Sequence, residues 1–417
     1  MYPVERYPNI SDHGLIGDLQ TAALVSTDGT VTWYCCPRFD SPSVFASLLD
    51  ADKGGFFRAS PDRDDYVSKQ LYLPDTAVLI TRFMTPDGVG EIHLMRETVS
   101  FWRNWLHGST YQGRWREMVG RSALTLKLMT YAPTGAPVAA PTAALPEQVG
   151  GERNWDYRYT WIRDGSFSIY ALLGLGFTEE AVAFGDWLCE HWDQPDEGIW
   201  ETRGGRKDFV YGRIQTWVAL DRAIKLATSR ARPADLQRWR TERDAVYNQV
   251  FEKGWNPKIG GFTQYYGSEV LDSALLMMPQ QGLIAPRDPL WLSTLAAIDR
   301  ELVSDSLVYR YNPSASPDGL AGHEGTFSLC TFWYVNALAR SGRLNDAQLT
   351  FEKMHTYANH LGLYSEEIGS TGEQLGNFPQ AFSHLALISA AVNLDHQLDH
   401  GAGSMPMTTG NTPVTGA

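Results

Sequence analysis

The segment "WDQPDEGIWETRGG", residues 192–205, places a carboxylate directly after an indole. Trp200 lies between the apolar Ile199 and the acidic Glu201, in a segment too rich in glycine and proline to form a solvated helix face. A carboxyl group packed against an indole loses hydration of its charged form, which raises its pKa and lets it hold a proton near neutral pH. Glu201 therefore suits a general acid, although a glutamate at a helix end also fits this pattern.

Other segments between predicted helices combine acids, arginine or amide side chains with aromatics and glycines. They are "GGERNWDYRYTWIRDGS" (150–166), "PDGLAGHEGTF" (317–327) and "GLYSEEIGSTGEQLGNFPQ" (362–380). Such loops, gathered at one end of a helical barrel, would form an acidic and aromatic pocket of the kind that binds a neutral sugar. Glycoside hydrolysis needs two carboxyl groups, one to protonate the leaving oxygen and one to activate water or attack the anomeric carbon. A second carboxylate is therefore expected from a distant part of the chain.

Composition narrows the classes of function. The 417 residues, 43% of them hydrophobic, can form a large core in one or two domains. A net charge of −13 disfavours nucleic acid and anionic membranes as partners. The sequence shows neither a signal peptide nor an apolar run long enough to span a membrane, so a cytoplasmic protein is expected. The four cysteines lack metal-binding spacing, so no metal and no other cofactor is predicted.

The N-terminal part, residues 1–95, has the pattern of an antiparallel β-domain. "AALVSTDGTVTWYCC" predicts two strands joined at Asp28-Gly29, and "DTAVLITRFMTPDGVGEIHLM" repeats this pattern around Asp87-Gly88. Residues 96–112 are then expected to form a linker helix.

The rest of the chain has helical periodicity. Helices that are apolar all round, such as 324–339, are followed by amphipathic ones, such as 343–357. This alternation predicts inner helices wrapped by outer helices over residues 113–397. The polar tail, residues 398–417, is expected to be disordered.

Four motifs, in chain order, resemble those of glycoside hydrolase family 15, the glucoamylase and bacterial trehalase group. They are "NWDYRYTWIRD", "GIWETRG", "EGTFSLCTFW" and "GEQLGNFPQAFSHLALI". The N-terminal "IGDLQTAALVSTDGTVTWYCCPRFDSPSVFASLLD" resembles the start of the bacterial branch. The resemblance covers about residues 10–397. It implies a mainly α protein, an (α/α)6 barrel preceded by an antiparallel β-sandwich-like domain, that inverts configuration at the anomeric carbon.

The resemblance also implies roles for single residues. Glu201 matches the general acid of the family, and Glu373 in "GEQLGNFPQ" matches its general base. Arg163 and Asp164 match the pair that hydrogen-bonds the hydroxyls of the nonreducing glucose. The further substrate-binding candidates are Trp155, Trp200, Arg203 and Glu324.

Several nearby residues invite other assignments. Glu366 and Glu367 are rival bases, but they lie outside the matching motif. His323 and His384 lack a third ligand at a spacing that would hold a metal. His384, in "FSHLALI", is expected to be a hydrogen-bonded core histidine.

The chain departs from the family pattern in its β-domain. "GEIHLMRETVSFWRNWL" passes almost directly from a strand region into the linker helix, so a large block of the sandwich is absent. The remaining sheet would have exposed edges and apolar faces, which proteins normally cover. Either it pairs with another subunit in a homo-oligomer, or it forms a compact smaller sheet on the barrel.

The favoured hypothesis is an inverting hydrolase that releases glucose from a small neutral α-glucoside, with the trehalase type preferred. One alternative is a glucoamylase or isomaltose-type glucohydrolase acting on oligosaccharides. Another is a non-hydrolytic or sugar-binding descendant of the family. The presence of Glu201, Glu373 and the Arg163-Asp164 pair argues against simple loss of catalysis.

Overall fold

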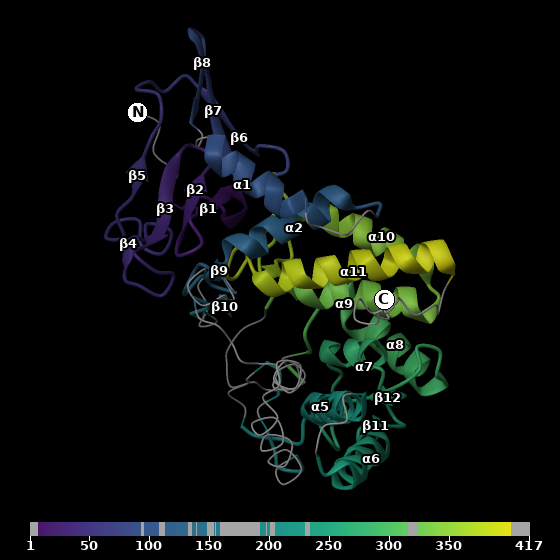
Figure 1. Ribbon diagram of the computed structural model, residues 1–417. Helices are drawn as coiled ribbons and strands as arrows, with labels where there is room; N and C mark the ends of the chain where they lie inside the picture. Colours follow the sequence, from purple (N-terminus) through teal and green to yellow (C-terminus); the bar gives the residue numbers. More distant parts are fainter. Residues whose placement is uncertain are drawn as a thin grey trace, which may run out of the picture. The chain divides into compact units, whose positions relative to one another are not determined.

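Figure 1 shows the computed structural model of the chain, which forms two compact units. One unit contains residues 1–161 and 322–417, and the other contains residues 162–321. The structure describes residues 7–92, 96–107, 113–131, 136–138, 140–147, 154, 156–158, 192–196, 198–200, 205–229, 234–312, 314–315 and 324–401.

The first unit begins with two antiparallel sheets. In one, the strands follow the order β1 (His13–Gly17), β2 (Ala22–Ser26), β3 (Thr30–Cys35) and β4 (Ser43–Phe45), and β5 (Phe57–Arg58) also pairs with β3. The other contains β6 (Val67–Tyr72), β7 (Leu79–Thr85) and β8 (Gly88–Ile92).

Both predicted hairpins are confirmed. The β2–β3 turn contains Asp28-Gly29, where Gly29 adopts a positive φ of 82° that glycine accepts without strain. In the second hairpin Thr85 pairs with Gly88 across the turn. All five residues of β2 are buried, whereas all five residues of β8 are exposed at the free edge of the second sheet. Among the described strands, β2 is therefore covered on both faces, and β8 is an open edge.

The helices of the first unit lie near both ends of the chain. They are α1 (Arg96–His107), α2 (Arg116–Leu128), α9 (Ser328–Ser341), α10 (Leu344–His355) and α11 (Ala381–His400). The short elements beside them are η1 (Ile10–Asp12), β9 (Thr130–Tyr131), β10 (Ala136–Pro137), β15 (Thr326–Phe327), β16 (Glu367–Ile368) and β17 (Gln374–Leu375).

The predicted alternation of helix types is confirmed for α9 and α10. Every residue from Ser328 to Ala339 in α9 is buried, whereas α10 buries one stripe that includes Phe351 and Met354. The last helix, α11, continues to His400, three residues into the segment expected to be a polar tail. Arg114 forms ion pairs with Asp395 and Asp399, which hold this last turn in helical form.

The two sheets share a hydrophobic core with α1, α2 and the residues around the start of α11. It joins strand residues to residues of α1, α2 and the segment before α11, including Leu15, Trp33, Trp102, Leu124, Leu363 and Phe378. The Trp33 indole N–H donates to the Pro141 carbonyl at 2.8 Å. The Asn359 side-chain amide donates to the carbonyls of Ser11 and His13 at 3.1 and 2.9 Å. The N-terminal strands thus anchor the segments that contain the acidic residues described below.

His384 lies in this core, as predicted. Its Nδ1 is 2.9 Å from the Ser122 hydroxyl, and its Nε2 accepts the Tyr364 backbone N–H at 3.3 Å. Burial lowers the pKa of His384 to about 3, and the nearby charge of Arg121 acts in the same direction. The imidazole is therefore neutral in the folded protein at ordinary pH.

The second unit contains α5 (Val210–Ser229), α6 (Leu236–Lys253), η2 (Ser273–Met277), α7 (Met278–Gln281) and α8 (Pro289–Glu301). Its strand pairs are β11 (Trp255–Asn256) with β12 (Gly261–Phe262), and β13 (Val303–Ser304) with β14 (Leu307–Val308). Among the described residues of this unit, all strand pairs are antiparallel. No helix in the described parts of the chain is long and apolar enough to cross a membrane.

Candidate active site

The predicted site residues fall into two groups. Five of them lie outside the residues that the structure describes: Trp155, Arg163, Asp164, Glu201 and Arg203. Trp200, Glu324 and Glu373 are described: Trp200 belongs to the second unit, and the two glutamates belong to the first.

Glu373 lies exposed in the turn between β16 and β17. Its carboxylate folds back onto the turn and accepts the Thr371 hydroxyl and, at 3.1 Å, the Thr371 backbone N–H. The Thr371 hydroxyl lowers the pKa of Glu373. These contacts stabilise a tight turn, and they leave the carboxylate on the surface of the first unit.

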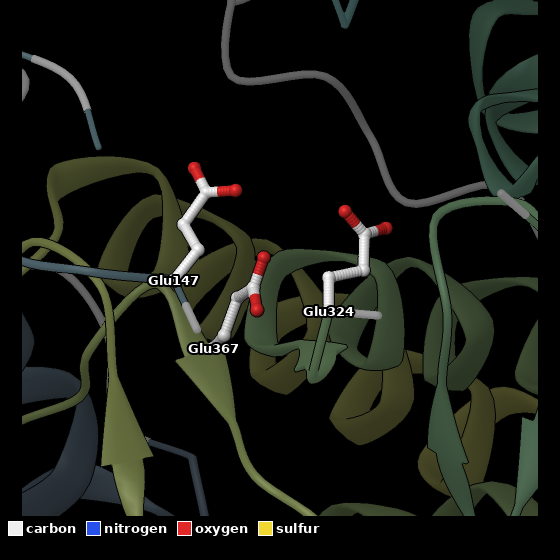
Figure 2. Close-up of side chains that lie close together, drawn as sticks. All are labelled: Glu147, Glu324 and Glu367. Carbon is white, nitrogen blue, oxygen red and sulfur yellow. The ribbon is translucent and has the colours of Figure 1, made fainter. Parts of the chain in front are cut away.

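A cluster of three buried carboxyl groups lies in the same unit (Figure 2). Glu147, Glu324 and Glu367 come from three separate segments and are at most 8% exposed. One carboxylate oxygen of each lies within 4.8 Å of the others. In Figure 2 the carboxyl groups of Glu147 and Glu324 lie on either side of Glu367. Of the predicted site residues that the structure describes, Glu324 is therefore the one that lies among other buried acids.

Strand pairing brings two of these acids together. Thr326 pairs with Ile368 and Phe327 with Glu367, so the residues just before β15 lie beside β16. The Gly325 backbone N–H donates to Glu367 Oε2 at 2.8 Å. A Cβ on Gly325 would lie 2.6 Å from the Ile368 carbonyl oxygen, so only glycine fits this close approach.

The cluster can do chemistry that a single acid cannot. Carboxylate oxygens accept hydrogen bonds and bind cations, so three of them at this separation suit a bound cation or hydroxyl groups that donate hydrogen bonds. Glu147 had no signal in the sequence, because its segment, "AALPEQ", matches none of the motifs. Only the fold brings Glu147 beside Glu324 and Glu367.

Glu366, one residue before Glu367, is also fully buried and has a different environment. Its Oε2 accepts the Asn377 backbone N–H at 3.1 Å and the Asn377 side-chain amide at 3.4 Å. Its Oε1 accepts the Gln380 side-chain amide at 3.3 Å. An ionised carboxylate can only accept hydrogen bonds, and each of these three contacts supplies an N–H donor.

Two hydroxyl groups fix the amides around Glu366. Thr142 donates to Asn377 Oδ1 at 3.0 Å, and its oxygen accepts the Phe378 backbone N–H at 3.2 Å. Ser383 donates to Gln380 Oε1 at 2.6 Å. The Thr142 hydroxyl thus orients the Asn377 NH2 group toward Glu366. The Ser383 hydroxyl also lies 3.1 Å from the Ser365 carbonyl oxygen, so it links the Gln380 amide to the backbone beside Glu366.

In the second unit, Trp200 is oriented through its indole N–H. This group lies 3.0 Å from both carboxylate oxygens of Asp272. The Arg310 guanidinium carbon lies 5.4 Å from the centroid of the Trp200 ring, within the range of a cation–π interaction. Burial raises the pKa of Asp272 to about 6, and hydrogen bonds from Ala274, Trp200 and Gln264 oppose that rise.

The comparison with known protein families decides the class. Residues 113–188 and 183–392 match the family described as Glycosyl hydrolases family 15, and residues 4–89 match Trehalase-like, N-terminal. The first of these matches covers more than half of the chain. The chain belongs to glycosyl hydrolase family 15. The glycoside hydrolase predicted from the motifs is thereby confirmed.

Two Trehalases that resemble this family 15 hydrolase are longer than it is. The chain is 31% identical to a Trehalase of Thermoplasma volcanium, with 95% of each chain covered. It is 28% identical to a Trehalase of Mycobacterium tuberculosis, over 98% of this chain and 93% of that one. The first alignment runs over 593 positions although this chain has 417 residues, so the relative contains segments without a counterpart here.

Solved structures agree on the fold. A bacterial glucoamylase complexed with acarbose superposes with a TM-score of 0.55 at 16% identity, covering 72% of this family 15 chain and 58% of the other. A solved glycosidase structure superposes with a TM-score of 0.51 at 18% identity, covering 67% and 96%. The expected combination of N-terminal antiparallel sheets and a helical remainder is confirmed at this level.

Proposed function

We propose that this chain is an inverting trehalase-type hydrolase that releases glucose from a small, neutral α-glucoside. The observation that carries this proposal is the similarity to proteins named Trehalase, which extends over nearly the whole of both chains. Buried carboxyl groups in the first unit support it, because glycoside hydrolysis needs two of them near the scissile bond. We also propose that the helical part, residues 113–397, forms an (α/α)6 barrel.

The acid in this mechanism is Glu201, which follows Trp200 in the matching motif. It would protonate the leaving oxygen while the base activates a water molecule on the opposite face of the sugar. Inversion requires the two carboxyl groups to lie roughly 6.5–9.5 Å apart, which leaves room for that water. Arg163 and Asp164 would bind the hydroxyls of the nonreducing glucose, with further contacts from Trp155, Trp200, Arg203 and Glu324.

For the base, burial and hydrogen bonding favour Glu366 over the residue in the sequence motif, Glu373. A base must be ionised and held in place, and three N–H donors hold Glu366. Glu367 is less suited, because oxygens of two other carboxyl groups lie within 4.8 Å of its own and crowd the position that a water molecule would need. Glu373 remains the alternative, and its exposed position and its contacts with Thr371 fit a turn-stabilising role better.

The experiment is hydrolysis of trehalose, maltose and isomaltose in parallel by the purified chain. Trehalose is expected to be cleaved fastest, and proton NMR of the first product should show β-glucose released together with α-glucose, one from each half of the disaccharide. A clear preference for maltose or isomaltose would instead support the glucohydrolase alternative. Retention of configuration at the attacked carbon would refute the inverting mechanism.

A further inference from the structure

The backbone of Glu366 is fixed on both sides. Its N–H donates to the Asn377 carbonyl at 3.1 Å, and its carbonyl accepts the N–H of Ser328, the first residue of α9, at 3.0 Å. Glu366 immediately precedes β16, and β16 pairs with both β15 and β17. The Glu366 side chain therefore starts from a fixed position beside the loop that follows β17.

This loop approaches the Glu366 side chain closely. Gly376 adopts a φ of 74°, and a Cβ placed on it would lie 2.8 Å from both Cβ and Oε2 of Glu366. Only glycine fits this backbone conformation and this approach. The close approach lets the next residue, Asn377, direct its backbone N–H at Glu366 Oε2, at 3.1 Å.

Asn377 reaches the carboxylate of Glu366 with two donors. Its side-chain NH2 group lies 3.4 Å from the same oxygen that accepts its backbone N–H. Both residues are fully buried. An ionised carboxylate only accepts hydrogen bonds, whereas a proton on Oε2 would face these N–H groups. The two donors of Asn377 therefore stabilise the ionised form of Glu366 relative to the neutral form.

Thr142 determines which end of the Asn377 amide faces the carboxylate. The Thr142 hydroxyl donates to Asn377 Oδ1 at 3.0 Å and accepts the Phe378 N–H at 3.2 Å. With the amide turned over, Oδ1 would face Glu366 Oε2, and two acceptors would meet. Glu366 is not among the hydrogen-bond partners of Thr142, so Thr142 acts on the carboxylate through Asn377.

Other titratable groups lie on the elements packed around Glu366. They help to set the pH at which Glu366 gains a proton, but they are the same in the wild type and in variants of Asn377 or Thr142. A difference between wild type and variant therefore reports on the two mutated positions. The groups among the described residues are Glu147, Glu324, Cys330, Tyr364, Glu367, Glu373 and His384, of which His384 is neutral because burial lowers its pKa to about 3.

We propose that Asn377 is a positioning residue that holds Glu366 in its ionised form, and that Thr142 sets the direction of the Asn377 amide. This inference rests on the proposed function, in which Glu366 is the general base. A base must be ionised to take a proton from the attacking water. In that mechanism both Asn377 and Thr142 act through the Glu366 carboxylate.

The test is the pH profile of kcat/KM on trehalose, because its acidic limb reports the ionisation of the base in the free enzyme. Asn377→Asp keeps the shape of the side chain and replaces the NH2 donor with an oxygen, which places a second carboxyl group beside Glu366. Thr142→Val keeps the shape and removes the hydroxyl. Each variant should move the acidic limb to higher pH by about one unit, the equivalent of one hydrogen bond to a charged group. Thr142→Ser, which keeps the hydroxyl, should return the limb to the wild-type position.

Thr76→Val is the matched control. Thr76 is fully buried like Thr142, and its hydroxyl also accepts a backbone N–H, that of Val78 at 3.1 Å, and donates to an oxygen, the Leu73 carbonyl at 2.7 Å. This variant should lose stability as Thr142→Val does, but it should keep the acidic limb within about 0.2 pH unit of wild type, because its hydroxyl belongs to a separate network.

A second control tests the alternative base. Thr371→Val removes the hydroxyl that Glu373 accepts. It should leave the acidic limb unchanged if Glu366 is the base. A shift in Thr371→Val without a shift in Thr142→Val would make Glu373 the base and would overturn the inference. A wild-type limb in both Asn377→Asp and Thr142→Val, or an equal shift in Thr76→Val, would also overturn it. If circular dichroism shows that Asn377→Asp does not fold, Thr142→Val and Thr142→Ser carry the test.

A measurement without substrate separates this inference from the proposed function. Carbon-13 NMR of protein labelled at the glutamate side-chain carboxyls follows the ionisation of Glu366, whose signal is the one missing from Glu366→Gln. The midpoint of its titration should rise by about one pH unit in Asn377→Asp and in Thr142→Val. An unchanged midpoint would overturn the inference. A raised midpoint in a chain that does not cleave trehalose would support the role of Asn377 and would refute only the proposed substrate.

Discussion

Acid sensitivity of the first unit is expected to depend on His384. The folded protein keeps this imidazole neutral, because burial lowers its pKa to about 3 from an ordinary 6.5. Protonation would add a hydrogen to Nε2, which now accepts the Tyr364 N–H. The unfolded chain binds a proton at His384 below pH 6.5, and the folded chain does not do so until about pH 3. The contribution of the neutral His384 to the free energy of unfolding is therefore full above pH 6.5. It is lost as the pH falls from 6.5 to about 3.

The size of this effect follows from the two pKa values. At pH 5 the unfolded state gains about 2 kcal/mol from protonation at this residue, and at pH 4 about 3 kcal/mol. A His384→Gln variant loses hydrogen bonds and is less stable overall, but it has no proton to bind in this range. Between pH 7.5 and pH 5 its free energy of unfolding should therefore fall by about 2 kcal/mol less than that of the wild type.

Urea denaturation followed by circular dichroism at the two pH values measures this difference. His400→Gln is the control, because His400 lies exposed at the end of the same helix. The control should follow the wild-type pH dependence. If His384→Gln and the wild type lose the same free energy between pH 7.5 and pH 5, the argument from burial is refuted.

Further variants test the acidic residues and the close approaches that position them. Glu366→Gln should lower kcat on trehalose by about 10²-fold or more, whereas Glu373→Gln should change it less than about threefold; the reverse order in steady-state kinetics would favour the motif residue as the base. Thr142→Val leaves the Phe378 N–H and Asn377 Oδ1 without their hydroxyl partner, so urea denaturation should show a loss of about 2–4 kcal/mol, and Thr142→Ser should restore most of it. Gly325→Ala places a methyl group 2.6 Å from the Ile368 carbonyl oxygen, so the thermal midpoint should fall by several degrees, and an unchanged midpoint would contradict the close packing of β15 and β16.

Local sequence signals predicted most of the secondary structure. Asp28-Gly29 and Asp87-Gly88 identified both hairpins, because these turns require residues that tolerate unusual backbone angles. The periodicity of apolar residues predicted α9 and α10, and the apolar character of α9 on all sides predicted its burial. These features depend on neighbours within a few residues of each other. Local signals do not contain the ion pairs of Arg114 with Asp395 and Asp399, which join α11 to a distant part of the chain.

The four motifs predicted the family, because their residue types and their order along the chain are specific to it. The match to glycosyl hydrolase family 15 confirms this prediction. The surroundings of each acid required the tertiary structure. Glu366, Glu367 and Glu373 lie within eight positions of one another, yet one is held by amides, one lies among other acids and one is exposed. The groups that surround the two buried acids come from residues such as Thr142 and Glu147, more than two hundred positions away. Sequence alone therefore determined which acids are present, and only the packing of distant segments decided the environment of each one.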